Sequence, residues 1–100
     1  MELRQLRSLL SVCDNDFSVS RAAALLNIVQ PAVSQHLKQL ESQLSTPLFQ
    51  RRGKRLVGLS PAGEKVAQYA REAVRAEANI LAVGDELEQP GRGLLRIGAT

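Results

Sequence analysis

The sequence has little of what several classes of protein require. It contains one cysteine, Cys13, and one histidine, His36, among 100 residues, which excludes an internal disulfide and any cysteine-rich zinc site. The longest uninterrupted apolar run, residues 22–26, has five residues, whereas a membrane-spanning helix needs about 20. We therefore expect no metal, no membrane partner, and a soluble chain in the reducing cytoplasm.

What is present indicates a small folded chain with unevenly distributed charge. The sequence is 44% hydrophobic and 23% charged, which is typical of globular rather than disordered proteins. Residues 1–65 carry nine basic and five acidic side chains, residues 66–100 carry four and five, and four basic residues crowd into 51–55. This distribution permits a polyanionic partner, although charge alone favours the simpler interpretation of a solvated basic loop.

Apolar spacing and capping signals predict three helices near the N-terminus. The first runs from Leu3 into the polar cluster at residues 14–16, because apolar residues recur every three or four positions. Ser18 is a suitable N-cap for a second helix over about 19–26. A third, over about 30–44, has proline in its first turn and apolar residues on one face. Few residues separate the last two helices, which predicts a helix-turn-helix.

A short hairpin is predicted after the third helix. Residues 48–51 and 55–59 are strand candidates on either side of a tip at 52–54 that contains glycine. Because an isolated two-stranded hairpin is marginally stable in water, it must pack on the helices. We expect Phe49 and Leu59 to anchor it there.

A long helix is predicted over 61–88, starting at the N-cap Ser60 with Pro61 in the first turn. Apolar residues along it alternate in spacing between three and four, which is typical of a helix that pairs with a second helix. Residues 89–93 break the helix, and 94–98 are a strand candidate without a partner, so we expect them to open a second domain that is missing from the fragment. The predicted dimerisation seam consists of Val66, Tyr69, Ala73, Ala76, Ile80, Val83 and Leu87.

Five short motifs in the sequence carry a resemblance to a known family. They are Ser18 to Ala23, Gln30 to Ser34, Leu40-Glu41, Leu48 to Arg51, and Leu59 to Gly63. Their order and spacing resemble those of the DNA-binding half of LysR-type transcriptional regulators, and the resemblance covers about residues 1–98. Further short matches, at Asn15 to Ser20, Gly53-Lys54, Pro90 and Gly93-Leu94, are similar to the branch that contains the cysteine-regulon activators.

The resemblance implies a mainly α fold in three parts. Residues 1–60 would form a winged helix-turn-helix with a two-stranded β wing, residues 61–88 a dimerising linker helix, and residues 89–100 a hinge and the first strand of an absent effector-binding domain. That domain would resemble a periplasmic binding protein and bind a small-molecule effector, with no cofactor in the fragment itself. The implied protein is a bacterial regulator that forms a homodimer, or a tetramer when whole, with double-stranded DNA as its partner and RNA polymerase as a further candidate.

A helix-turn-helix reads DNA by placing its second helix in the major groove. Glutamine there can pair with adenine, and proline or alanine can pack on a thymine methyl group. Basic residues of the wing suit phosphates and a narrow minor groove, while the start of the preceding helix suits a phosphate. The predicted DNA-binding residues are Ser20, Arg21, Gln30, Pro31, Ala32, Ser34, Gln35, Lys38, Arg51, Arg52, Lys54 and Arg55.

The sequence departs from the family pattern at several positions. Val29 stands where Ser or Thr usually precedes the reading helix, and valine cannot cap it, which costs about 1 kcal/mol. Ser45 replaces a common glycine and would be strained as a left-handed C-cap. Gln35 occupies a place often held by arginine. We expect His36 to be a packed or backbone-contacting residue, and Cys13 to belong to the core.

One alternative from another class remains open on the sequence. The chain would then be a coiled-coil protein-interaction module whose basic hairpin only improves solubility. Salt dependence separates the two, since DNA binding through phosphates weakens steeply with salt. An enzyme is not expected, because no catalytic set of nucleophile, base and orienting residue occurs in the sequence.

Overall fold

The computed structural model of the protein describes residues 1–88, so the hinge predicted at 89–93 and the strand predicted at 94–98 lie outside the described residues. The predicted fold class, mainly helical with a two-stranded antiparallel sheet, is confirmed. Each helix lies where its spacing and capping residues predict it, and the first strand begins one residue later than expected. The elements are α1 (Leu3–Asp14), α2 (Val19–Leu26), α3 (Gln30–Leu44), β1 (Phe49–Arg52), β2 (Arg55–Leu59) and α4 (Pro61–Glu88).

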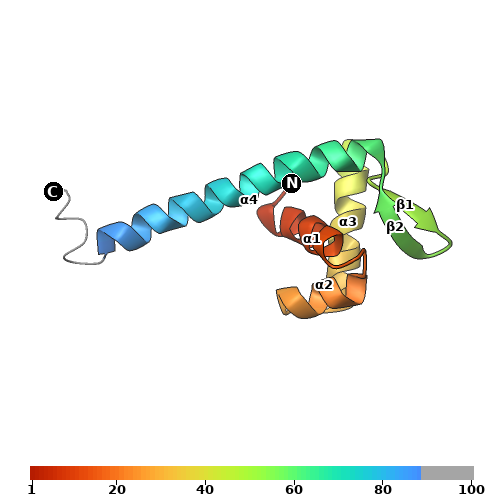
Figure 1. The fold of residues 1–100 in the computed structure, drawn as a ribbon, viewed down its shortest axis with the longest axis horizontal. Coiled ribbons are helices and arrows are strands. Elements are labelled where there is room, and N and C mark those ends of the chain that lie inside the picture. Colours follow the sequence, from red (N-terminus) through yellow and green to blue (C-terminus); the bar gives the residue numbers. More distant parts are fainter. Residues whose placement is uncertain (89–100) are drawn as a thin grey trace.

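Three short helices form the body of the molecule, and α4 extends from it (Figure 1). Helix α1 contacts α2, α3 and the first half of α4. The hairpin projects from the side of the molecule that lies away from the free end of α4. Leu9, Val33 and Leu40 are fully buried where α1 and α3 meet. Ala22 and Ala23 of α2 are also buried, and their small side chains let α2 approach its neighbours closely. The three helices thereby share one apolar core.

The helix ends match the capping expectations. The hydroxyl of Ser18 accepts a hydrogen bond from the backbone N–H of Arg21 at 3.2 Å, and so caps α2. No side chain caps α3 at Val29, as predicted. Ser45 follows α3 with a left-handed φ of 53°, which confirms the strained C-cap expected for a non-glycine residue there.

The hairpin is a wing whose apolar side chains, from both strands, pack on the core. Leu48 and Phe49 are buried, and Leu59 packs against the same cluster, so both predicted anchors are confirmed. Gly53 has a φ of 63° at the first position of the two-residue loop, where glycine suits tight hairpins. In α4, a Cβ at Gly63 would collide with the backbone carbonyl oxygen of Leu48. Glycine is therefore required for α4 to begin so close to the wing.

Helix α4 is joined to α1 by packing and by two ion pairs. Ala70 is buried against the core, and α4 continues from there along α1. Arg71 donates two hydrogen bonds to the carboxylate of Asp14, at 2.7 and 3.3 Å, and this bonding raises the pKa of the guanidinium. Arg7 of α1 pairs with Glu77. None of the helices that the structure describes is both long enough and apolar enough to span a membrane.

Candidate nucleic-acid interface

The exposed face of α3 carries four of the ten polar residues predicted to contact DNA. Val33 and Leu37 turn inward, so the opposite side of the helix is left to solvent. Ala32 is half-buried at its margin, beside His36. The exposed side chains form an open hollow of about 770 Å³, here called the helix hollow. It is lined by Gln30, Pro31, Ser34, Gln35, Lys38 and Gln39.

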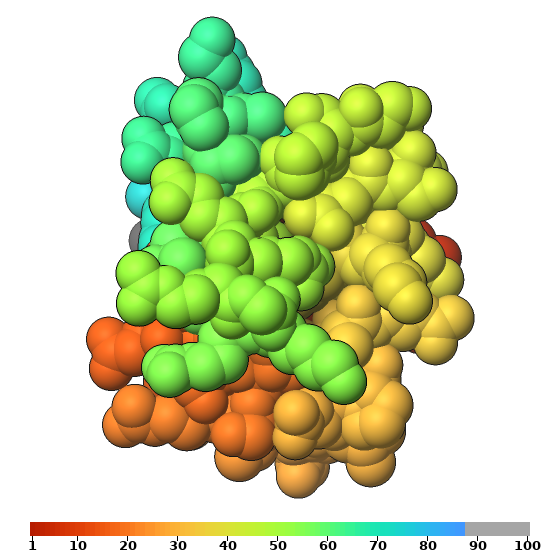
Figure 2. All heavy atoms as spheres, turned by 90° about the vertical axis from the view of Figure 1, so that its right-hand side faces the viewer, coloured from red at the N-terminus to blue at the C-terminus, as the bar shows by residue number. Residues whose placement is uncertain are grey.

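A second hollow, of about 300 Å³, lies where the start of α2 meets the wing, and is here called the wing hollow. Figure 2 shows this face, with the wing in green across the middle and α2 in orange below it. The hollow brings together four residues that the sequence analysis predicted to contact DNA: Ser20, Gln30, Lys54 and Arg55. Gln30 lines both hollows, so they lie next to each other. The wing hollow is lined by Asp16, Phe17, Ser18, Val19, Ser20, Gln30, Lys54, Arg55 and Leu56.

Two arginines of the predicted set pair with carboxylates of the same chain. The guanidinium of Arg51 lies 3.5 Å from the carboxylate of Glu41, which also accepts a hydrogen bond from the backbone N–H of Leu48 at 2.8 Å. Glu41 thus ties the wing to the end of α3. Arg21 lies 3.4 Å from the carboxylate of Asp16. The sequence analysis names both arginines among the predicted DNA-binding residues, and their contacts with DNA stay predictions.

Two polar contacts dock α3 on α1. Nδ1 of His36 lies 2.6 Å from the hydroxyl of the fully buried Ser8, and the side-chain amide of Gln5 donates to Gln39 at 2.8 Å. His36 is half-buried, as a packed histidine would be, although its partner is a side chain rather than the backbone. Gln5 and Ser8 lie with Val12 on the buried face of α1, and the sequence analysis identified neither of these two polar residues.

The predicted dimerisation seam is divided between two environments. Val66 and Ala73 are half-buried against the core of their own domain. The remaining seam residues point to solvent, and Ile80 and Leu87 are 70% and 79% exposed. Among residues 1–87, no group of three side chains is placed to hold a metal ion. The exposed seam residues are Tyr69, Ala76, Ile80, Val83 and Leu87.

Comparison with known proteins gives a consistent set of similarities. The family model described as "Bacterial regulatory helix-turn-helix protein, lysR family" matches residues 3–64. The chain is 56% identical over 100 residues to the HTH-type transcriptional regulator CysB of Thiocapsa roseopersicina, covering all of this chain and 74% of that one. It is 36% identical over 100 residues to CysB of Haemophilus influenzae, covering all of this chain and 31% of that protein. The chain thus spans about a third of the length of the Haemophilus relative.

Solved structures share the fold. The complex of the BenM DNA-binding domain with catB site 1 DNA matches with a TM-score of 0.76 and 29% identity, over 85% of this chain and 92% of that one. A full-length OxyR variant from Pseudomonas aeruginosa matches with a TM-score of 0.82 and 25% identity, over 89% of this chain and 30% of that one. The first of these similar proteins was solved bound to DNA.

Proposed function

This chain belongs to the LysR family of bacterial regulatory helix-turn-helix proteins, and on that premise we propose that residues 1–60 bind duplex DNA sequence-specifically as the reading unit of a transcriptional regulator. The observation that carries the proposal is that Gln30 lines both the helix hollow and the wing hollow. A helix face suited to base edges therefore lies next to a crevice whose basic side chains, Lys54 and Arg55, suit phosphate. Catalysis forms no part of the proposed role.

Helix α3 would lie in the major groove, with its N-terminal turns toward the base edges. Gln30 and Gln35 can each donate to and accept from adenine, and Pro31 can pack on a thymine methyl group. No side chain caps α3, Pro31 has no backbone N–H, and that of Ala32 donates to the carbonyl oxygen of Val29 at 3.0 Å. The start of α3 would therefore attract a phosphate mainly through the helix dipole. Base reading and phosphate positioning would thus come from the same end of α3.

The wing would supply sequence-independent affinity. Arg52, Lys54 and Arg55 are exposed around its tip, and cations so placed suit phosphates and a narrow minor groove. Arg51 is about half exposed beside Glu41. Because Arg51 pairs with Glu41, it would contribute less to DNA affinity than the three residues at the tip.

Dimerisation through the second half of α4 belongs to the same proposal. Ile80, Val83 and Leu87 expose apolar surface along one helix, as a seam awaiting a second helix does. Two reading units on one duplex would double the phosphate contacts. The alternative, a protein-interaction module with a solubilising hairpin, shares this seam but requires no DNA.

The remaining parts of the proposal concern the whole protein. Residues 61–88 would connect the reading unit to a hinge and the first strand of an effector-binding domain at 89–100. The support is that the chain spans only about a third of its Haemophilus relative. We assign to the whole protein a small-molecule effector, a tetrameric state, a cytoplasmic location and a contact with RNA polymerase.

Selection of bound fragments from random duplex DNA tests the function. We expect a preferred sequence, with binding that weakens steeply between about 50 and 200 mM salt. Gln30→Ala should cost about 1 to 3 kcal/mol on that sequence and relax the preference, whereas Lys54→Ala should weaken all sequences alike. Binding that is absent or independent of salt would instead favour the protein-interaction module. An unchanged preference in Gln30→Ala would remove α3 as the reading helix.

A further inference from the structure

The loop between α1 and α2 holds an acidic side chain at the edge of the surface proposed for DNA. Asp16 and Phe17 both have left-handed backbones, with φ of 56° and 61°. Such a conformation is costly for a bulky residue and persists only where the surroundings hold it. Here the backbone N–H of Phe17 donates to the carbonyl of Val12 at 2.9 Å, and its ring meets Phe49 edge to face at 6.4 Å. These contacts hold the loop backbone from which the Asp16 side chain projects.

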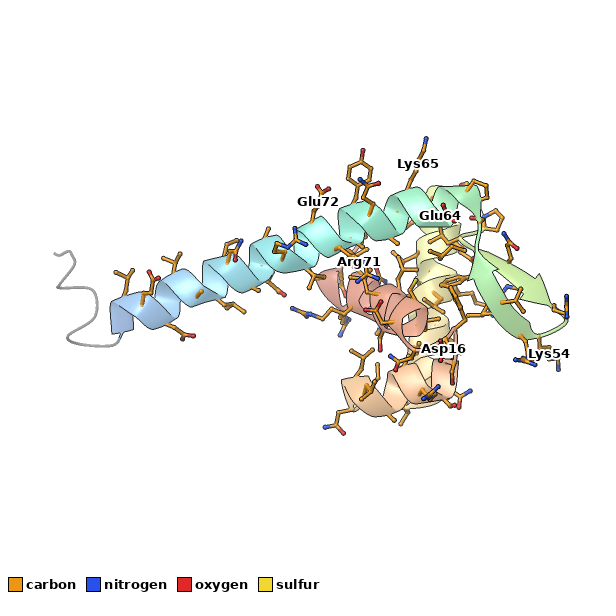
Figure 3. All side chains as sticks on the ribbon, viewed as in Figure 1. Asp16, Lys54, Glu64, Lys65, Arg71 and Glu72 are labelled. Carbon is orange, nitrogen blue, oxygen red and sulfur yellow. The ribbon has the colours of Figure 1, made fainter. Side chains whose placement is uncertain are left out.

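Asp16 is the one acidic residue lining the wing hollow, and its side chain is 91% exposed. Figure 3 shows Asp16 and Lys54 on the side of the molecule away from the free end of α4. The carboxylate of Asp16 accepts from Arg21 Nη1 at 3.4 Å. A carboxylate on a surface that contacts phosphates weakens DNA binding in two ways. It repels the phosphates, and it pairs with a basic side chain that could otherwise bind one. Affinity for DNA alone therefore does not explain why an acidic residue lies at this position.

We propose that Asp16 is a specificity-determining residue that holds Arg21 away from the phosphate backbone of non-cognate DNA. The proposal rests on the proposed function. Non-specific affinity comes almost entirely from phosphate contacts, so occupying one cation per subunit lowers it. An exposed ion pair is weak, and a phosphate that base contacts hold in register can displace Asp16 from Arg21. The cognate complex then recovers the contact, and the ratio of specific to non-specific affinity rises.

Asp16→Asn tests this with little disturbance of the loop, because asparagine tolerates a left-handed backbone as aspartate does. We expect it to tighten binding to a duplex of arbitrary sequence by about two- to fivefold per subunit. The slope of log affinity against log salt should steepen by about 0.9 per subunit, since one more phosphate is neutralised. Binding to the selected sequence should change less, so the specificity ratio falls.

The matched control is Glu72→Gln, which removes the same charge from the exposed face of α4, away from the wing hollow (Figure 3). It should leave the specificity ratio and the salt slope unchanged. Equal effects of the two variants would overturn the proposal, because net charge alone would explain them. Asp16→Gly also suits the positive φ, and should reproduce the Asp16→Asn result if that variant does not fold.

Arg21→Ala separates an action through Arg21 from direct repulsion of phosphate. If Asp16 acts by holding Arg21, Asp16→Asn has no effect on non-specific affinity in the Arg21→Ala background. A persistent increase in that background would overturn the role of Arg21. A parent protein that binds duplex and responds to Gln30→Ala, but not to Asp16→Asn, refutes this proposal and leaves the proposed function standing. A parent that binds no duplex overturns both.

Discussion

The two halves of α4 differ in what covers their apolar side chains. Up to Glu77 the helix lies along α1, and the seam residues Val66 and Ala73 are half-buried against the core of its own domain. Beyond that point Ile80 and Leu87 lie on a helix that extends from the body of the molecule (Figure 1). The same apolar repeat runs through both halves. A heptad pattern therefore predicts that a helix is covered, but not whether its own domain or another chain covers it.

A charge introduced into the exposed second half of α4 should have the largest effect, on dimer affinity. Ile80→Glu would place a carboxylate twice in the proposed dimer seam, which should cost about 4 kcal/mol per dimer, or roughly a thousandfold in dimer affinity. The reading unit should stay folded, because Ile80 lies outside its core. Sedimentation should then give the monomer mass with an unchanged helical spectrum. A mass that stays dimeric would place the dimer contact elsewhere.

The same replacement, glycine by alanine, can be made once in each half of α4 to test the comparison. Gly63→Ala should lower the free energy of unfolding by about 2 to 3 kcal/mol, because its Cβ meets the carbonyl oxygen of Leu48, which cannot move without shifting the wing. Gly84→Ala has open space around it and should stabilise the helix by about 0.5 to 1 kcal/mol. Urea unfolding at one protein concentration measures both. Equal effects would mean that the start of α4 does not pack closely on the wing.

The helices and the hairpin were predictable because their signals are local. The apolar spacing from Leu3, the Ser18 cap and the Pro61 start each act within a few residues, and the elements follow them. The left-handed pair at Asp16 and Phe17 was not predictable in the same way. Contacts with Val12 and Phe49 hold that loop, and the sequence does not show that these residues meet.

The candidate interface was predictable by residue type and less so by arrangement. The exposed face of α3 follows from helical periodicity, since Val33 and Leu37 must face the core. Neither the pairing of Arg51 with Glu41 nor the contact between Ser8 and His36 has a local signal. Each joins residues far apart in the chain, and depends on how two finished elements pack.

Ion pairs join the first half of α4 to α1. Of the features compared here, they should contribute least to the free energy of unfolding. Asp14 and Arg71 are each about half exposed, so a double-mutant cycle with Asp14→Ala and Arg71→Ala should give a coupling of about 0.5 kcal/mol. That coupling should shrink with added salt, because exposed charges are screened. Arg75→Ala removes an equal charge one turn further along, and should show no coupling to Asp14. If Arg71 and Asp14 are also uncoupled at low salt, packing by Val74 and its neighbours alone sets where α4 leaves the domain.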